Sequence, residues 1–241
     1  METTDASIPL LFFGIDVQAA ARGCPYAVVD CAGESVDAGW VSGSGWDVVT
    51  SLDAMVQRLA ASRGSPSAVG IDAPRMYLPT PRKWYWDGSG LRWRARRPTD
   101  LGNGRHCEVV IAAHRLANPQ WTPHRHPFPD WMQLGFALFA AIAKRAPVYE
   151  VFPSASYTVL ESVAPLRIGV RLNDFAPGPK DMLDAYMAAA TVREYLQGHG
   201  CAVGGGDGLG SIILPRPILK PIANVLRWPE EIGKTEIDAL R

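Results

Sequence analysis

The sequence has few cysteines and no long apolar run. Its 241 residues include four cysteines, and none of them forms a Cys-x-x-Cys pair. Their wide, irregular spacing argues against a disulfide framework and favours reduced thiols. The longest apolar-rich run, from Trp131 to Ala143, is too short to cross a bilayer and contains Gln133 and Gly135. We therefore expect neither a membrane span nor a small secreted domain held together by disulfides.

The sequence also lacks a net charge and a recognisable secretion signal. Lys and Arg number 24, as do Asp and Glu. The first residues, Met1 to Asp5, are acidic, and the apolar run from Leu10 to Phe13 is shorter than a signal-peptide core. We therefore expect a cytoplasmic protein. A hydrophobic content of 47% and a charged content of 20% are ordinary for a globular chain, and the length suits a single domain over residues 1–241.

Apolar patterning predicts an α/β fold. Continuous apolar runs predict buried strands, and spacings of three and four residues predict helices. The expected strands cover residues 10–16, 26–30, 39–41, 68–72 and 147–153. One expected helix begins at Ser51, and two more cover residues 131–143 and 179–197. Pro179 at the start and Gly198 just beyond the end make the last of these the clearest helix in the sequence.

A basic, aromatic segment separates the fourth strand from the second helix. Residues 75–128 are rich in Pro, Gly, Arg and Trp without sustained periodicity, which predicts a loop-rich insertion. Its cations alternate with aromatic rings, a composition that can hold phosphates while bases stack on the rings. The residues expected to do so are Arg94, Arg96, Arg97, Trp84 and Trp93. Nucleic acid is therefore the leading predicted partner, although the tryptophans could equally pack the insertion onto the core.

Acidic residues close the predicted strands and open the last helix. Asp16 and Asp72 each end an apolar strand, and open α/β sheets place their sites at the carboxyl ends of strands. Asp181 and Asp184 are three residues apart, so they project from neighbouring points on one helix face. Glu150 lies in another expected strand. Each acid alone could merely end a strand or favour a helix start, but together they indicate a shared site.

Clustered carboxylates favour a hard divalent cation. They repel one another, and a bound Mg²⁺ or Mn²⁺ relieves that repulsion. Two such ions could activate water and stabilise the entering and leaving oxygens of a phosphodiester. We expect Asp16, Asp72 and Asp184 to bind the metal, with Asp181 and Glu150 supporting them as further catalytic residues. A zinc site is disfavoured, because His106, Cys107 and the other histidines lack finger spacing.

The same acids belong to segments that resemble the domain-of-unknown-function 429 family, which is described as predicted nucleases with a ribonuclease H-like fold. The resemblance covers residues 13 to about 215. The segments that carry it are Gly14-Ile15-Asp16, Gly70-Ile71-Asp72-Ala73-Pro74, Arg105-His106-Cys107-Glu108, Glu150-Val151-Phe152-Pro153-Ser154-Ala155, Asp181-Met182-Leu183-Asp184-Ala185 and Gly210-Ser211-Ile212-Ile213-Leu214-Pro215. It implies a mixed central sheet flanked by helices and a metal-dependent nuclease activity.

Two questions stay open at the level of sequence. Arg105, His106 and Glu108 could orient a scissile phosphate or serve in proton transfer, or Arg105 could form a structural ion pair with one of the strand-end acids. The chain could also be a catalytically inactive ribonuclease H-like protein that binds nucleic acid or a protein partner through the basic aromatic insertion. An actin-like kinase is a weaker alternative, because the sequence has no second phosphate-binding strand and turn.

Overall fold

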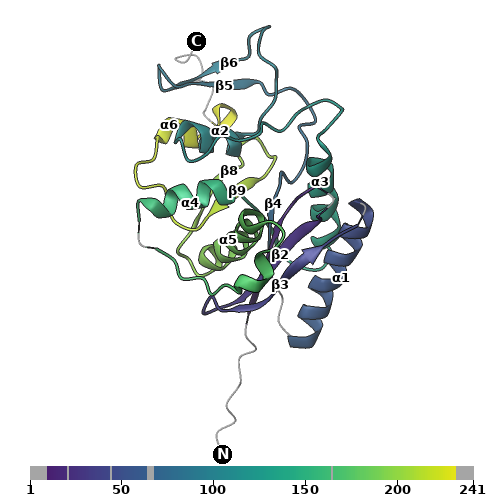
Figure 1. Cartoon of the computed structure of the whole chain (residues 1–241). Helices are drawn as coiled ribbons and strands as arrows, with labels where there is room; N and C mark the ends of the chain where they lie inside the picture. The colour runs from purple at the N-terminus through teal and green to yellow at the C-terminus, as the bar shows by residue number, and fades with distance from the viewer. Residues whose placement is uncertain (1–9, 21, 44, 64–67, 164, 232–241) are drawn as a thin grey trace, which may run out of the picture.

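The protein is built on a mixed central sheet. The computed structural model describes residues 10–20, 22–43, 45–63, 68–163 and 165–231 (Figure 1). Within them, seven strands lie in the order β3-β2-β1-β4-β7-β9-β8. The strands are β1 (Leu11–Asp16), β2 (Cys24–Asp30), β3 (Ser35–Val41), β4 (Ala68–Asp72), β7 (Val148–Val151), β8 (Cys201–Gly204) and β9 (Ser211–Leu214). The predicted α/β class is confirmed.

Strand direction divides the sheet into two parts. β2 runs antiparallel to both β1 and β3, whereas β1, β4, β7 and β9 run parallel to one another. β8 closes the far edge antiparallel to β9. The carboxyl ends of β1, β4 and β7 therefore lie side by side at one edge of the sheet, which holds the candidate site described below.

Helices cover both faces of the sheet (Figure 1). On one face, α1 (Gly45–Arg63) and α3 (Asp130–Ile142) pack against Phe13, Ile15 and Ile71. On the other face, α5 (Pro179–Leu196) packs against Phe12 and residues of β2 and β4. Because side chains alternate along a strand, odd-numbered residues of β1 meet α1 and α3, and even-numbered residues meet α5.

Two glycines bring α5 unusually close to the sheet. A Cβ atom on Gly14 would lie 2.0 Å from the carbonyl oxygen of Ala185, and one on Gly70 would lie 2.8 Å from that of Ala188. No side chain fits at either position, so the helix backbone rests almost directly on β1 and β4. The start of α5 is thereby fixed above the ends of these two strands.

Several predicted boundaries need correction. α1 begins at Gly45, six residues before the expected start at Ser51. Residues 75–128, expected to be mostly loop, contain the hairpin β5 (Trp84–Asp87) and β6 (Arg92–Ala95) and the helix α2 (His106–Ala113). α2 was not predicted, because residues 106–111 are all buried and the helix therefore lacks the one-sided apolar stripe that marks a helix in a sequence. α4 (Pro153–Glu161), beside α5, was also not predicted.

The remaining helix is short, and the thiols are unpaired. α6 (Ala223–Leu226) packs with α2 near β9. All four cysteines are free. No helix in the described ranges is both long enough and apolar enough to cross a membrane. The acidic N-terminal segment on which the expectation of no leader rested lies outside the described residues.

Candidate functional site

Two aspartates end neighbouring parallel strands on the same face of the sheet. Asp16 of β1 and Asp72 of β4 are register partners. They follow Gly14 and Gly70 by two residues, so strand alternation directs both carboxylates toward α5. Asp16 is 4% exposed, and Asp72 keeps some accessible surface in a cavity. The sequence pattern of an apolar strand followed by Asp therefore correctly indicated that these two residues meet.

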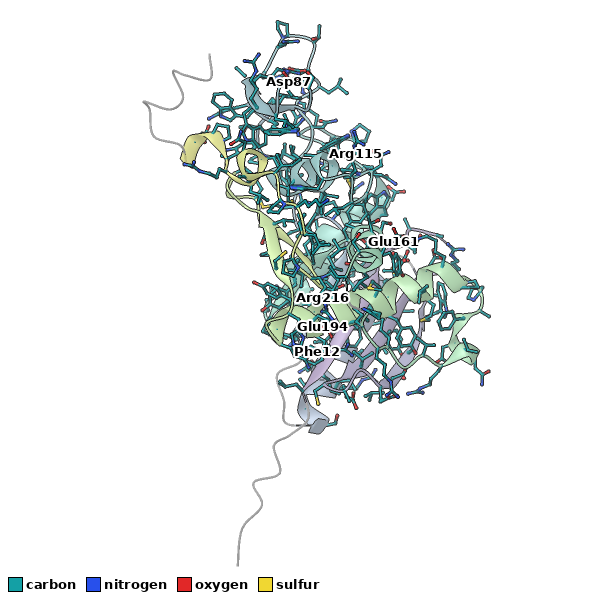
Figure 2. The ribbon with its side chains drawn as sticks, turned by 90° about the vertical axis from the view of Figure 1, so that its left-hand side faces the viewer. Phe12, Asp87, Arg115, Glu161, Glu194 and Arg216 are labelled. Atoms are coloured by element: carbon teal, nitrogen blue, oxygen red, sulfur yellow. The ribbon has the colours of Figure 1, made fainter. Side chains whose placement is uncertain are left out.

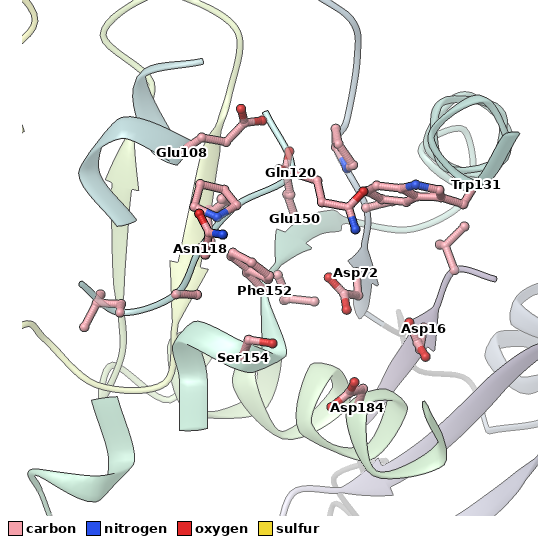
Figure 3. Close-up of a pocket in the computed structure, with 18 of the residues that line it drawn as sticks. Asp16, Asp72, Glu108, Asn118, Gln120, Trp131, Glu150, Phe152, Ser154 and Asp184 are labelled. Atoms are coloured by element: carbon pink, nitrogen blue, oxygen red, sulfur yellow. The ribbon is translucent and has the colours of Figure 1, made fainter. Parts of the chain in front are cut away.

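Asp184 joins them from the first turns of α5. It is 5% exposed, and Figure 3 shows its carboxylate facing the same space as those of Asp16 and Asp72. The hydroxyl of Tyr157 donates a hydrogen bond to its Oδ1 over 2.9 Å. The ammonium of Lys180, one turn earlier, donates to its Oδ2 over 2.5 Å. Asp184 is thus held in place by a phenol and a cation that the sequence reasoning did not assign.

The electrostatics of this cluster favour protonation or a cation. Burial raises the pKa of Asp16 to about 7, and the charges of Asp184 and Asp181 add to that rise, while a hydrogen bond from Gln18 opposes it. Burial also raises the pKa of Asp72 well above its ordinary value, with Asp16 and Asp184 contributing further. Mutual repulsion of this kind is relieved when positive charge enters the site.

Asp181 points to a different partner from Asp184. Its carboxylate forms an ion pair with the guanidinium of Arg22. It lines the same cavity, but its negative charge is already balanced locally. Asp181 was expected to support the cluster directly. Its side chain instead meets the Arg22 guanidinium, so Asp181 lies at the margin of the cluster.

Glu150 is engaged in a buried ion network rather than open to a metal. It follows Tyr149, which faces α5, so alternation along β7 turns Glu150 toward the opposite side. Both of its carboxylate oxygens accept hydrogen bonds from Arg105, and its Oε2 also accepts the backbone N–H of Arg75 over 2.9 Å. Glu150 was predicted to support a metal, but its contacts are those of a structural ion pair with Arg105.

Arg105 ties two buried acids together. It is 1% exposed, and its Nε donates to Oε1 of Glu108 over 2.9 Å while its terminal nitrogens reach Glu150. Glu108 also accepts hydrogen bonds from the backbone N–H and the hydroxyl of Thr122. Arg105 thus forms a structural ion pair, but its partners are Glu108 and Glu150 rather than one of the expected strand-end acids, Asp16 and Asp72. This network joins α2 to β7 and to the loop before α3, and so shapes one wall of the cavity.

The acids open into a cavity of about 570 Å³. Its floor carries Asp16, Asp72 and Asp184, and a second wall carries side chains of quite different chemistry (Figure 3). That wall contains Asn118, Gln120, Trp131, Phe152 and Ser154. No sequence pattern indicated these residues as part of a site, because they come from a loop, the start of α3 and the start of α4.

The predicted nucleic-acid residues lie away from this cavity, in the β5–β6 hairpin. Figure 2 shows Asp87 of the hairpin at the opposite end of the molecule from Phe12 of β1. Trp93 is 2% exposed, and its Nε1 donates to the carbonyls of Asn224 and Arg227. Trp93 is therefore a core residue, as the packing alternative proposed.

The other hairpin residues combine packing with exposure. Trp84 is half-buried against the same core cluster as Trp93. Arg94 forms a two-pronged ion pair with Asp100, over 2.7 and 2.9 Å. Arg96 donates to the backbone carbonyl of Asp100 at 3.3 Å, and its side chain and that of Arg97 lie on the surface. The arginines thus partly brace the hairpin and partly face solvent.

The acidic floor offers magnesium two carboxylates rather than a complete set of ligands. Within the described ranges, no group of three or more His, Cys, Asp or Glu side chains is arranged so that it could hold a metal ion. Magnesium, however, is commonly held by one or two carboxylates, with waters and substrate phosphates completing its shell. Asp16 and Asp72, from adjacent strands, supply such a pair, while Lys180 occupies one oxygen of Asp184. The donor chemistry therefore suits a hard cation that substrate helps to bind.

Comparison with known proteins adds no assignment. The chain matches no family model, and no curated protein matches it. The functional argument therefore rests on the geometry of the acidic cavity and on the charges around it.

Proposed function

We propose that the protein is a metal-dependent nuclease with a ribonuclease H-like fold, which hydrolyses phosphodiester bonds with Mg²⁺ or Mn²⁺. The observation that carries the proposal is the meeting of Asp16, Asp72 and Asp184 at the open end of a parallel strand pair. Such a placement is where open α/β sheets bind ligands. The mixed sheet with an antiparallel β1-β2-β3 edge, together with the resemblance to the domain-of-unknown-function 429 family, supports the fold assignment.

In this function the chain's own residues divide the work. Asp16 and Asp72 would hold the divalent ion, and Asp184 would join them or orient a water. A bound ion would lower the pKa of water and polarise a phosphoryl oxygen. Lys180 and Tyr157 hold the Asp184 carboxylate, and Arg105 fixes the wall beside it. Because the pKa of Asp16 is raised, its carboxyl tends to keep a proton in the absence of metal, and metal binding would release that proton.

A second candidate function is nucleic-acid binding without catalysis. The β5–β6 hairpin supports it, since the side chains of Lys83 and Arg92 are 72% and 63% exposed at one end of the molecule. Exposed cations on a hairpin can neutralise phosphates. This function would not need the acidic cavity. We also propose a cytoplasmic location, which four free cysteines favour.

Manganese binding by isothermal titration calorimetry tests the proposal. The comparison is between the wild type and Asp16→Asn, with Asp87→Asn as a control that removes a half-buried aspartate outside the cavity. Binding that is lost only in Asp16→Asn, together with metal-dependent cleavage of oligonucleotides by the wild type alone, is the expected result. Cleavage that persists undiminished in Asp16→Asn would refute the site. Nucleic-acid binding that is independent of metal and of Asp16 would favour the second function.

A further inference from the structure

The cavity is too acidic to attract a phosphate chain by charge. Among the described residues that line it, six side chains are acidic and two are basic, and with Arg22, which pairs with Asp181 from outside the lining, the formal excess is three negative charges. The six acids are Asp16, Asp72, Glu108, Glu150, Asp181 and Asp184, and the two cations are Arg105 and Lys180. Both cations are already paired with carboxylates. One divalent ion would offset only part of this excess, so a phosphate-bearing substrate needs other favourable contacts.

The wall that faces Asp16, Asp72 and Asp184 also offers uncharged contacts. Asn118 and Gln120 flank the buried Pro119, and both have exposed side chains that line the cavity. Within the described part of the chain, neither side-chain amide has a hydrogen-bond partner. The rings of Trp131 and Phe152 are half-buried and complete this wall (Figure 3). We call these four residues the amide–aromatic wall.

We propose that the amide–aromatic wall is a nucleobase subsite, which selects a single unstacked nucleotide as the substrate of the acidic floor. A side-chain amide carries both donors and an acceptor, so it can pair with the edge of a base. Flat rings offer faces on which any base can stack. This inference rests on the proposed function for the identity of the floor as the phosphate-cleaving part, whereas the subsite can be tested by itself.

The dimensions of the cavity favour one nucleotide over a duplex. A volume of about 570 Å³ falls within the range of sites that enclose one small ligand, roughly 300–1,000 Å³. A base inside a duplex is stacked and paired, so its faces and pairing edge are not free for the wall. The substrate is therefore a nucleotide within a single strand or one turned out of a helix, whereas a free nucleotide, which has no phosphodiester bond to hydrolyse, binds only as a ligand. No residue of the β5–β6 hairpin is among the described residues that line the cavity, so the hairpin is not part of the subsite.

Calorimetry with small ligands tests the subsite directly. The ligands are the four nucleoside 5′-monophosphates and ribose 5-phosphate, each titrated into the wild type in the presence of Mg²⁺. At least one nucleotide should bind about tenfold or more tightly than ribose 5-phosphate, because stacking and edge contacts are absent from the sugar phosphate. Gln120→Ala, Asn118→Ala and Trp131→Ala should each reduce that preference, with Trp131→Ala expected to weaken nucleotide binding roughly tenfold. Trp46→Ala, at an exposed tryptophan on α1, is the matched control and should change nothing.

The outcomes separate the subsite from the nuclease function. Equal binding of nucleotides and ribose 5-phosphate, or no nucleotide binding at all, overturns the subsite. A nucleotide preference that survives in both Gln120→Ala and Trp131→Ala also overturns it, even if the protein cleaves nucleic acid. A preference that persists when Mn²⁺ does not bind supports the subsite while the proposed nuclease function fails. Finally, a six-nucleotide single strand that binds better than its duplex supports selection of an unstacked nucleotide, whereas binding of monophosphates without binding of the single strand overturns a polynucleotide substrate.

Discussion

Replacing Asp16 by Asn should stabilise the metal-free protein at high pH and have little effect at low pH. Burial raises the pKa of Asp16 from 3.8 to about 7. Each pKa unit corresponds to about 1.4 kcal/mol, so ionising this group in the folded state costs about 4 kcal/mol as an upper estimate. Asn keeps the size of Asp and an oxygen that can accept the hydrogen bond from Gln18, but it carries no charge. The variant therefore avoids the cost.

The sign of the effect follows from proton linkage. Between pH 4 and pH 7 the folded Asp16 retains its proton while the unfolded one loses it, so the wild type loses stability as pH rises through this window. Below pH 4 both states are protonated and the penalty vanishes. The difference in unfolding free energy between Asp16→Asn and wild type should therefore grow from near zero at pH 4 to a few kcal/mol at pH 8. Urea denaturation followed by circular dichroism at both pH values measures it.

Comparing the two proteins cancels the titration of the shared groups that Asp16 does not influence; the pKa of Asp72, which the Asp16 charge helps to raise, falls in the variant and adds to the same trend. A difference that is the same at pH 4 and pH 8, or a variant that is less stable than wild type at pH 8, would refute the electrostatic account of the floor. Magnesium provides a second check. At one hundred times its dissociation constant it should add about 2.7 kcal/mol to the wild type and nothing to the variant. Stabilisation of both proteins by the same amount would place the metal elsewhere.

Three further changes test the frame of the site. Arg105→Ala should cost about 3–5 kcal/mol in urea denaturation, because two buried acids lose their shared cation; a loss below 1 kcal/mol would contradict this. Gly14→Ala should cost about 3 kcal/mol or more, since its Cβ would meet the backbone of α5; unchanged stability would show that the helix can move away. Replacing Arg94, Arg96 and Arg97 by Ala should weaken nucleic-acid binding and lower its salt dependence; an unchanged salt slope would exclude the hairpin from the interface.

Strands β1, β2, β4 and β7 and the meeting of Asp16 with Asp72 were predictable from sequence because they are local, whereas β5, β6, β8 and β9 were not predicted. An apolar run that ends in Asp indicates a buried strand and the position of its end, and two such strands in an α/β chain bring their ends to one edge. The long helix α5 was equally visible, within one residue of its observed end. In each case the pattern and the structure depend on the same few consecutive residues.

The environments of Glu150 and Asp181 were not predictable in this way. Glu150 meets Arg105 across 45 residues of sequence, and only the packing of α2 beside β7 brings them together. Asp181 meets Arg22 through a loop that no periodic pattern describes. The hairpin shows the same limit, because alternating Arg and Trp predicts a nucleic-acid surface as readily as it predicts the buried Trp93. Charge partners and burial depend on long-range contacts that a single sequence does not encode locally.

The β5–β6 hairpin and the cavity differ in charge, so they would bind a nucleic acid in different ways. Cations exposed on the β5–β6 hairpin can gather a polyanion from solution, whereas the cavity with its excess of acids repels it until a divalent ion is present. A nucleic acid bound only at the hairpin would therefore show strong salt dependence and no metal dependence. A nucleotide bound in the cavity would show the reverse, because its affinity would come from the metal and from contacts to its base. Measuring the salt dependence and the metal dependence of binding on one oligonucleotide separates the two surfaces. If both effects came from one shared site, the hairpin variant and the Asp16 variant would each change the salt effect and the metal effect together.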